Sequence, residues 1–199
     1  MQRYRQHQYR AGFTIVELLI VIVVIGVLAA IIIVAYSGVQ ERAYVTRINT
    51  AGRQYAKAIS LYAAGQGAYP AYGNRCLGSV SDYPTENGFD SGECVRSLSN
   101  PGGPPPYRSD GIASVSLDDA LKQYMPSLSA KNIKTVQFDD DDSVYRGYLY
   151  STASDGQGGS IARVLWFLNG TKDCGSGIYT EEIDNYQETM CTLTLPSIK

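Results

Sequence analysis

The 199-residue sequence predicts an α+β fold, in which one long N-terminal helix packs through its second half on an antiparallel β-sheet. An apolar run without charge from Leu18 to Ala35 predicts the helix, and an amphipathic segment prolongs it. In the last third of the chain, β-branched and aromatic runs alternate with turn residues, which is typical of antiparallel strands. A helix that covers one face of such a sheet gives the α+β arrangement.

The first 36 residues have the layout of a membrane anchor. Residues 1–12 contain His7 and three arginines but no acidic residue, whereas the first basic residue beyond the apolar run is Arg42. This asymmetry predicts a cytoplasmic N-terminus. Residues 13–36 would span about 36 Å, which is enough to cross a bilayer core of about 30 Å. We therefore expect a single-pass inner-membrane protein whose larger part is extracytoplasmic.

A secretory signal peptide is an alternative interpretation of this N-terminus. Such a peptide has an apolar region of about 7 to 15 residues, followed by a cleavage site of small residues. The apolar run here is longer, carries Glu17 near its start, and is followed at 35–38 by residues that fit such a site only loosely. A membrane anchor is therefore the favoured interpretation.

Glu17 is the most informative residue of the apolar run. Burying an ionised carboxylate in hydrocarbon costs at least a few kcal/mol, so Glu17 requires a partner, a place near the membrane interface, or both. The residues around it resemble the processing motif of type IV pilins and of the related pseudopilins of type II secretion systems. The string that carries this resemblance is Gly12-Phe13-Thr14-Ile15-Val16-Glu17-Leu18-Leu19-Ile20-Val21-Ile22.

The resemblance covers Arg10 to about Tyr62 and implies a processing step. A prepilin peptidase would cut between Gly12 and Phe13, which makes residues 1–12 a cytoplasmic leader, and would methylate the new amine of Phe13. Gly12 suits this cut because it lacks a side chain that could obstruct the protease. The other implied partners are further copies of the chain, other pilins, and the assembly platform and ATPase of the pilus or secretion machine.

The role of Glu17 follows from this cut. In an assembling filament, its carboxylate would pair at low dielectric with the cationic amine of Phe13 on a neighbouring subunit, which sets the register. The alternative is that Glu17 only complements the positive end of its own helix, an effect of about 0.3 to 1 kcal/mol. Many family members carry a proline in the outer part of the membrane segment, but this sequence has none there. Gly26 and Gly38 are therefore the positions at which the helix could bend or locally melt.

We expect residues 37–64 to continue the same helix. Apolar and aromatic residues recur at spacings of three and four and predict a face covered by the rest of the molecule, although a filament contact is the alternative. They are Tyr44, Ile48, Ala51, Tyr55, Ile59 and Tyr62. Gly65 and Gly67 should end the helix.

Residues 65–132 are rich in Gly and Pro and predict a long connection, irregular from Gly65 to about Ser114. A short helix is expected near 116–125, with Ser116 as N-cap, Asp119 in a capping box, and Leu117, Leu121 and Tyr124 on one face.

Residues 133–199 are expected to form the antiparallel sheet and a C-terminal disulfide loop. The predicted strands are 133–138, 144–151, 161–168 and 189–195.

The four cysteines all follow the membrane segment, and they allow three pairings. We favour Cys76 with Cys94 and Cys174 with Cys191, because each pair closes a loop of about 18 residues, worth about 3 kcal/mol in the chain-entropy model. The second pair also resembles the C-terminal disulfide of many pilins. A zinc site is disfavoured, since the spacings are wide and no histidine follows residue 12.

Composition argues against several other functions. Without a histidine, the processed chain cannot form a Ser-His or Cys-His pair, so we expect no catalytic residues, no cofactor and no enzyme activity. Asp139 to Asp142 could bind calcium, but a solvated turn is favoured over a metal site. The net charge of −2, which becomes −5 without the leader's three arginines, does not indicate a nucleic-acid partner.

The leading functional hypothesis is a subunit, major or minor, of a type IV pilus-like filament, located first in the membrane and then in the extracellular pilus. The sequence leaves two alternatives open: a pseudopilin of a type II secretion system, and a singly anchored extracytoplasmic binding module. It also leaves open whether the filament serves adhesion, motility, DNA uptake or secretion. Asn169-Gly170-Thr171 matches a glycosylation sequon, a pattern that is common by chance.

Overall fold

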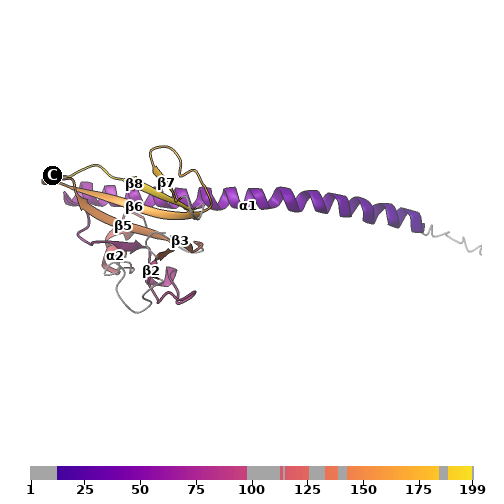
Figure 1. The fold of residues 1–199 in the computed structure, drawn as a ribbon, viewed down its shortest axis with the longest axis horizontal. Helices are drawn as coiled ribbons and strands as arrows, with labels where there is room; N and C mark the ends of the chain where they lie inside the picture. The colour runs from indigo at the N-terminus through magenta and orange to yellow at the C-terminus, as the bar shows by residue number, and fades with distance from the viewer. Residues whose placement is uncertain are drawn as a thin grey trace, which may run out of the picture. The chain divides into compact units, whose positions relative to one another are not determined.

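The computed structural model describes residues 13–97, 113, 115–125, 133–138, 143–183 and 188–198. The expected leader, including Gly12, and the acidic run Asp139 to Asp142 lie outside these residues. The chain divides into two compact units, Met1–Tyr44 and Val45–Lys199, and the helix α1 (Ile15–Gln66) contributes to both (Figure 1).

In the first unit, α1 runs unbroken through both glycines that the sequence singles out. A Cβ atom added at Gly26 or at Gly38 would meet no atom within 4 Å. Many residues of this segment are β-branched, which lowers helix propensity in water, but in lipid the backbone must satisfy its own hydrogen bonds. A continuous helix is therefore the conformation suited to a membrane.

In the second unit, α1 packs on a sheet through the face that its periodicity predicts. Ile48, Tyr55 and Ile59 are buried, which confirms that the second unit covers this stripe. The helix ends at Gln66, and Gly67 follows with a φ of +74° while its N–H donates to the carbonyl of Ala63 at 2.8 Å. Glycine adopts this left-handed conformation without steric cost, which explains the termination.

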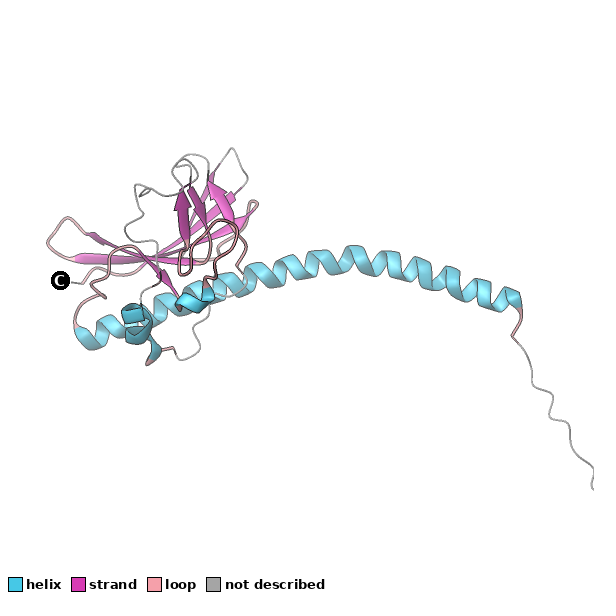
Figure 2. Ribbon diagram, turned by 90° about the horizontal axis from the view of Figure 1, so that it is seen from below, coloured by secondary structure: helices cyan, strands magenta, loops and turns pink. Residues whose placement is uncertain are grey.

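The main sheet has five antiparallel strands in the order β1-β5-β6-β8-β7 and lies along the C-terminal part of α1 (Figures 1 and 2). Its strands are β1 (Arg75–Leu77), β5 (Tyr148–Ser154), β6 (Ser160–Asn169), β7 (Tyr179–Ile183) and β8 (Glu188–Thr194). A smaller sheet has the order β2-β4-β3. Its strands are β2 (Val95–Ser97), β3 (Val136–Phe138) and β4 (Ser143–Tyr145). The α+β arrangement predicted from the sequence is confirmed.

Trp166 of β6 forms a close contact between α1 and the sheet. Its side chain is fully buried, and its indole N–H donates to Oδ1 of Asn49 at 2.8 Å. The ring lies against Gly52, where an added Cβ would come within 2.7 Å of a ring carbon. The absence of a side chain at Gly52 is therefore what lets the helix and the sheet approach so closely.

The prediction of one strand over 144–151 is wrong. The chain leaves the small sheet after β4 and enters the main sheet at β5, and the change occurs at Arg146 and Gly147. Gly147 has a φ of +83°, and an added Cβ would lie 2.5 Å from the ring of Tyr83. A positive φ in such a close contact excludes a side chain, so this glycine ends one strand and begins the next.

The connection expected to be irregular from Gly65 to about Ser114 contains structure in its described part. It holds β1, the 3₁₀ helix η1 (Val80–Asp82) and β2. The two strands pair with β5 and β4, which lie far along the chain. The sequence also predicts no strand at the position of β7. The strands β1 and β2 have three residues each, which is too few for a period-2 pattern to be visible, and two adjacent glutamates break the alternation in β7.

The short helix α2 spans Val115–Lys122, so Ser116 lies inside the helix and is not its N-cap. Asp119 forms an ion pair with Lys122 at 2.7 Å instead of a capping box. Leu117 and Leu121 are buried as expected. The ring of Tyr124 meets that of Tyr62 edge-on, with centroids 6.3 Å apart.

Candidate functional site

The start of α1 is closed by a reciprocal pair of side chains, Thr14 and Glu17. The backbone N–H and the hydroxyl of Thr14 both donate to Oε2 of Glu17, each at 2.8 Å. The N–H of Glu17 donates in turn to the Thr14 hydroxyl oxygen at 3.2 Å. Because α1 begins at Ile15, Thr14 is the N-cap residue and Glu17 is the third helical residue, which is the geometry of a capping box.

Thr14 is a site residue in addition to those expected from the sequence. The spacing Thr-x-x-Glu immediately before an apolar run is the signal that would have revealed it. The capping box gives Glu17 a local role at the helix end, which is the alternative to an assembly role. Both bonds that Glu17 accepts fall on Oε2, so within the described part of the chain Oε1 accepts no hydrogen bond and can receive a further donor.

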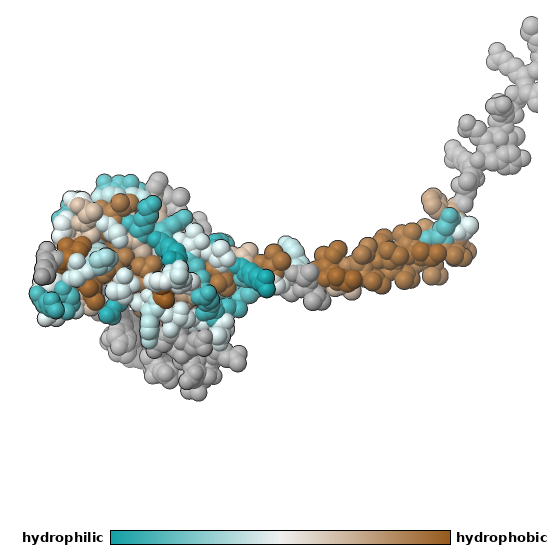
Figure 3. Space-filling view, turned by 90° about the horizontal axis from the view of Figure 1, so that it is seen from above, coloured by the Kyte–Doolittle hydropathy of each residue, from teal (hydrophilic) through white to brown (hydrophobic). Residues whose placement is uncertain are grey.

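Beyond Glu17, the first unit exposes large apolar side chains all along the helix. Phe13 is 83% exposed, and the apolar residues up to Ile33 are at least half exposed. Figure 3 shows them as a continuous hydrophobic stretch, with hydrophilic side chains only near its end. In the described part of the chain, α1 is the one helix long and apolar enough to cross a membrane. Such a surface requires lipid or other apolar helices around it.

In the second unit, two disulfides fix the loops around the sheets. The structure pairs Cys76 with Cys94, with Cα atoms 5.8 Å apart, and Cys174 with Cys191, with Cα atoms 5.7 Å apart. The first bond closes the connection between β1 and β2, and the second joins β8 to the residues that precede β7.

Two side chains of α1 hold the chain on either side of Cys174. Asn49 donates through Nδ2 to the carbonyl of Asp173 at 3.0 Å, and Arg53 donates to the carbonyl of Ser176 at 2.9 Å. Since Asn49 also accepts the indole N–H of Trp166, one helical turn binds both the sheet and the C-terminal disulfide loop.

No cluster of three or more metal-ligating side chains occurs among the described residues. The buried tyrosines are also held neutral, because burial raises the pKa of Tyr55, Tyr83 and Tyr150 above that of exposed tyrosine. Asn169 of the sequon is partly buried, and its Nδ2 donates to the carbonyl of Thr135 at 3.4 Å. Attachment of a glycan at Asn169 would require this contact to open.

Comparison with known proteins locates the similarity at the N-terminus. Residues 7–33 match the family described as the prokaryotic N-terminal methylation motif. The chain carries this methylation motif. The match includes Phe13, Thr14 and Glu17, so the capping box lies inside the motif. This match confirms the resemblance of the N-terminal segment to the processing motif that type IV pilins and pseudopilins share.

A curated relative agrees with the motif. The chain is 43% identical over 65 residues to the fimbrial protein EcpC of Eikenella corrodens, a stretch that covers 32% of this chain and 42% of the relative. The chain therefore spans less than half the length of this relative. No solved structure matches the chain significantly.

Proposed function

We propose that this protein is a structural subunit, major or minor, of a type IV pilus-like filament. The observation that carries the proposal is the start of α1, where a capped carboxylate within the methylation motif begins a long, exposed apolar helix. The similarity to a fimbrial protein supports the same function. A filament gives the apolar segment a place to be buried, because many copies of the helix can bundle away from water.

In this proposal, a prepilin peptidase cuts between Gly12 and Phe13 and methylates the new amine. Before assembly, the subunit is a single-pass membrane protein with its second unit outside the cytoplasm. The Thr14 N–H and hydroxyl satisfy Oε2 of Glu17 during this time, which lowers the cost of keeping a carboxylate at the edge of the bilayer.

Assembly would use the other carboxylate oxygen. Oε1 of Glu17 can accept a hydrogen bond from the charged amine of Phe13 of a neighbouring copy while Oε2 remains in the capping box. A subunit therefore need not lose its helix cap in order to assemble. An ion pair of this kind is strong only where water is excluded, as in a bundle of apolar helices. The machine's platform and ATPase would supply the work of extraction, and the function of the chain is structural, not enzymatic.

Substitutions at Glu17 and Thr14 separate the cap from the charge. Glu17→Gln keeps an acceptor for the capping box but removes the charge, whereas Thr14→Val removes the hydroxyl and keeps the charge. We expect Glu17→Ala and Glu17→Gln to insert into the membrane normally and to yield no sheared filaments. Thr14→Val should assemble with reduced yield, since a lost cap costs about 0.5–2 kcal/mol.

The readouts are the membrane-inserted protein and the filament protein recovered by shearing the cells. Normal filaments from Glu17→Ala would remove the assembly role of Glu17. Full assembly of Glu17→Gln together with failure of Glu17→Ala would mean that the cap, and not an ion pair, is what assembly requires.

A further inference from the structure

Charge is segregated between two segments of the second unit. The part of α1 from residue 45 to residue 66 carries Arg47, Arg53 and Lys57 and no acidic residue. The segment from residue 77 to Cys94 carries four acidic residues and no basic one. These acidic residues are Asp82, Glu86, Asp90 and Glu93. Opposite charges on separate surfaces of one molecule favour contacts between two copies of it.

The basic segment presents one exposed stripe to solvent. Thr50, Arg53, Lys57 and Leu61 follow one another at spacings of three and four and are all exposed, and we name them the helix face. Lys57 makes no hydrogen bond or ion pair within the described part of the chain. Its ammonium group is therefore available to a partner.

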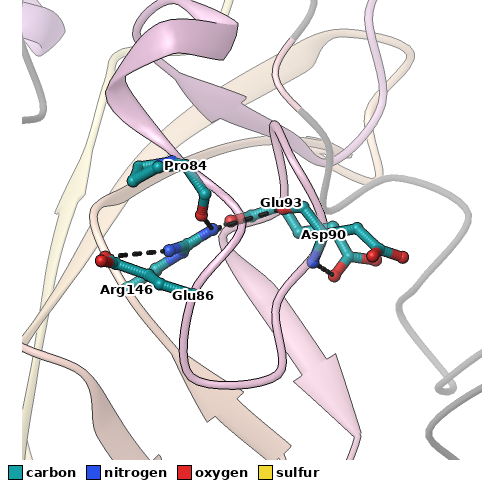
Figure 4. Close-up of polar contacts among 5 residues, drawn as sticks. All are labelled: Pro84, Glu86, Asp90, Glu93 and Arg146. Atoms are coloured by element: carbon teal, nitrogen blue, oxygen red, sulfur yellow. Dashed lines mark hydrogen bonds and ion pairs between the residues drawn. The ribbon is translucent and has the colours of Figure 1, made fainter.

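The acidic segment is held rigid by one buried arginine, Arg146, which is 5% exposed. Its guanidinium donates to the carbonyl of Glu93 at 2.8 Å and to that of Pro84 at 2.9 Å, and it lies 3.3 Å from a carboxylate oxygen of Glu86 (Figure 4). It also stacks over the ring of Phe89, 4.2 Å from its centroid. Together with the disulfide at Cys94, these contacts fix the shape of the segment before any partner binds.

Arg146 does not neutralise this segment completely. Glu86 remains 55% exposed, and Asp90 is exposed with a carboxylate that makes no hydrogen bond or ion pair to the described residues. We name the exposed residues Val80, Glu86 and Asp90 the acidic loop. Figure 1 shows the connection between β1 and β2, which contains this loop, below α1 and near the bottom of the unit.

Apolar exposure coincides with the same two surfaces. Among the described residues of the second unit, three large apolar side chains are exposed: Leu61 at 44%, Val80 at 37% and Tyr179 at 64%. Leu61 belongs to the helix face, and Val80 belongs to the acidic loop. An apolar contact surrounded by complementary charges is the usual composition of a protein interface.

We propose that the helix face of one copy binds the acidic loop of a second copy, with Lys57 facing Asp90 and Leu61 near Val80. The two surfaces are different parts of the same unit, so the contact is heterologous, and repeating it generates an open helical array unless it closes into a ring. This proposal rests on the filament function and assigns to it a contact outside the apolar helix bundle. The small sheet and its disulfide then serve to present a preformed docking loop.

A charge exchange tests the contact in the full chain. Lys57→Glu and Asp90→Lys each place like charges in the interface, and we expect each to lower the yield of sheared filaments about tenfold or more. The double variant restores the opposite charges in reversed order and should recover most of the yield. Arg163→Glu, a reversal at another exposed basic residue, is the matched control and should assemble normally.

Protease resistance and an intact mass that shows both disulfides formed check that each variant is folded. We expect each to be folded, because exposed substitutions change the free energy of unfolding by only about 0.5 kcal/mol. Normal assembly of both single variants, or no recovery in the double variant, would overturn the contact. Loss of assembly in Arg163→Glu to the same extent would also overturn it, since the effect would then be one of net charge. If the unaltered chain forms no filaments, the proposed function fails as well, whereas failure of the exchange alone removes only this contact.

Discussion

The two ends of α1 share one backbone conformation and have opposite surroundings. Up to Ile33 the apolar side chains are at least half exposed, whereas Ile48, Tyr55 and Ile59 are buried on the sheet. The second part thus has a partner within its own chain, and the first part must find one in lipid or in other copies. An apolar helix is therefore a core element only when the same molecule supplies the surface on which it packs.

Trp166→Ala would have the largest effect on the second unit. Removing a fully buried indole leaves a cavity against Gly52 and an unpaired Oδ1 on Asn49, and should lower the free energy of unfolding by about 3–5 kcal/mol. Thermal unfolding of the detergent-solubilised chain, followed by circular dichroism, measures this loss. Tyr179→Ala is the control, because Tyr179 is 64% exposed and should change the stability by about 0.5 kcal/mol or less. Equal stability of the two variants would contradict the packing described here.

Gly→Ala substitutions compare the two parts of the helix with the same chemical change. At Gly52 the new Cβ would come within 2.7 Å of the Trp166 ring, so the overpacking should cost about 1–3 kcal/mol. At Gly38 nothing lies within 4 Å, so alanine should only favour the helix, by about 1 kcal/mol. Thermal unfolding of the second unit measures the cost at Gly52, and the loss of helical circular dichroism on heating measures the gain at Gly38, which lies in the first unit. A tolerated Gly52→Ala would mean that the helix and the sheet can separate without cost.

The smallest expected effect is a dependence of stability on pH through Asp155. Its carboxylate accepts hydrogen bonds from the Ser197 hydroxyl and from the N–H groups of Gln157 and Gly159, and these bonds lower its pKa below the ordinary value of 3.8. Because its pKa is lower in the folded protein, Asp155 contributes its full stabilisation at pH values above 3.8. This stabilisation is lost as the pH falls through the pKa of the folded state. Asp155→Asn should therefore reduce the loss of melting temperature on acidification below that pH. An unchanged acid profile in the variant would remove this role of Asp155.

The sequence predicts those elements whose pattern is long enough to read. The apolar stripe of α1 and the segments of β5, β6 and β8 are visible because many residues repeat at the period of a helix or a strand. The strands β1 and β2 have three residues each and pair with strands far along the chain, so they have no local signal. The strand β7 pairs with the adjacent β8, but its five residues include two consecutive glutamates, which break the alternation of a strand. Likewise, the change of sheet at Gly147 depends on the ring of Tyr83, which lies far away in the sequence.

The candidate site shows the same limit at smaller scale. The motif around Phe13 and Glu17 can be read from the sequence, since every residue that defines it is local. The capping box can equally be predicted from the sequence, because Thr14 and Glu17 have the required spacing and both are local. The complementary surfaces around Lys57 and Asp90 could not be predicted, because exposure and the position of Arg146 emerge only from the folded chain.

The intact mass of protein sheared from the cell surface tests the central claim most directly. We expect the mass of residues 13–199, increased by one CH2 for methylation of the Phe13 amine and decreased by four hydrogens for the two disulfides. That value would show that the protein on the cell surface has been cleaved after Gly12, methylated at Phe13 and oxidised to two disulfides. A mass that retains residues 1–12, or one that begins at another residue, would contradict processing at Gly12 and with it the amine that Glu17 is proposed to bind.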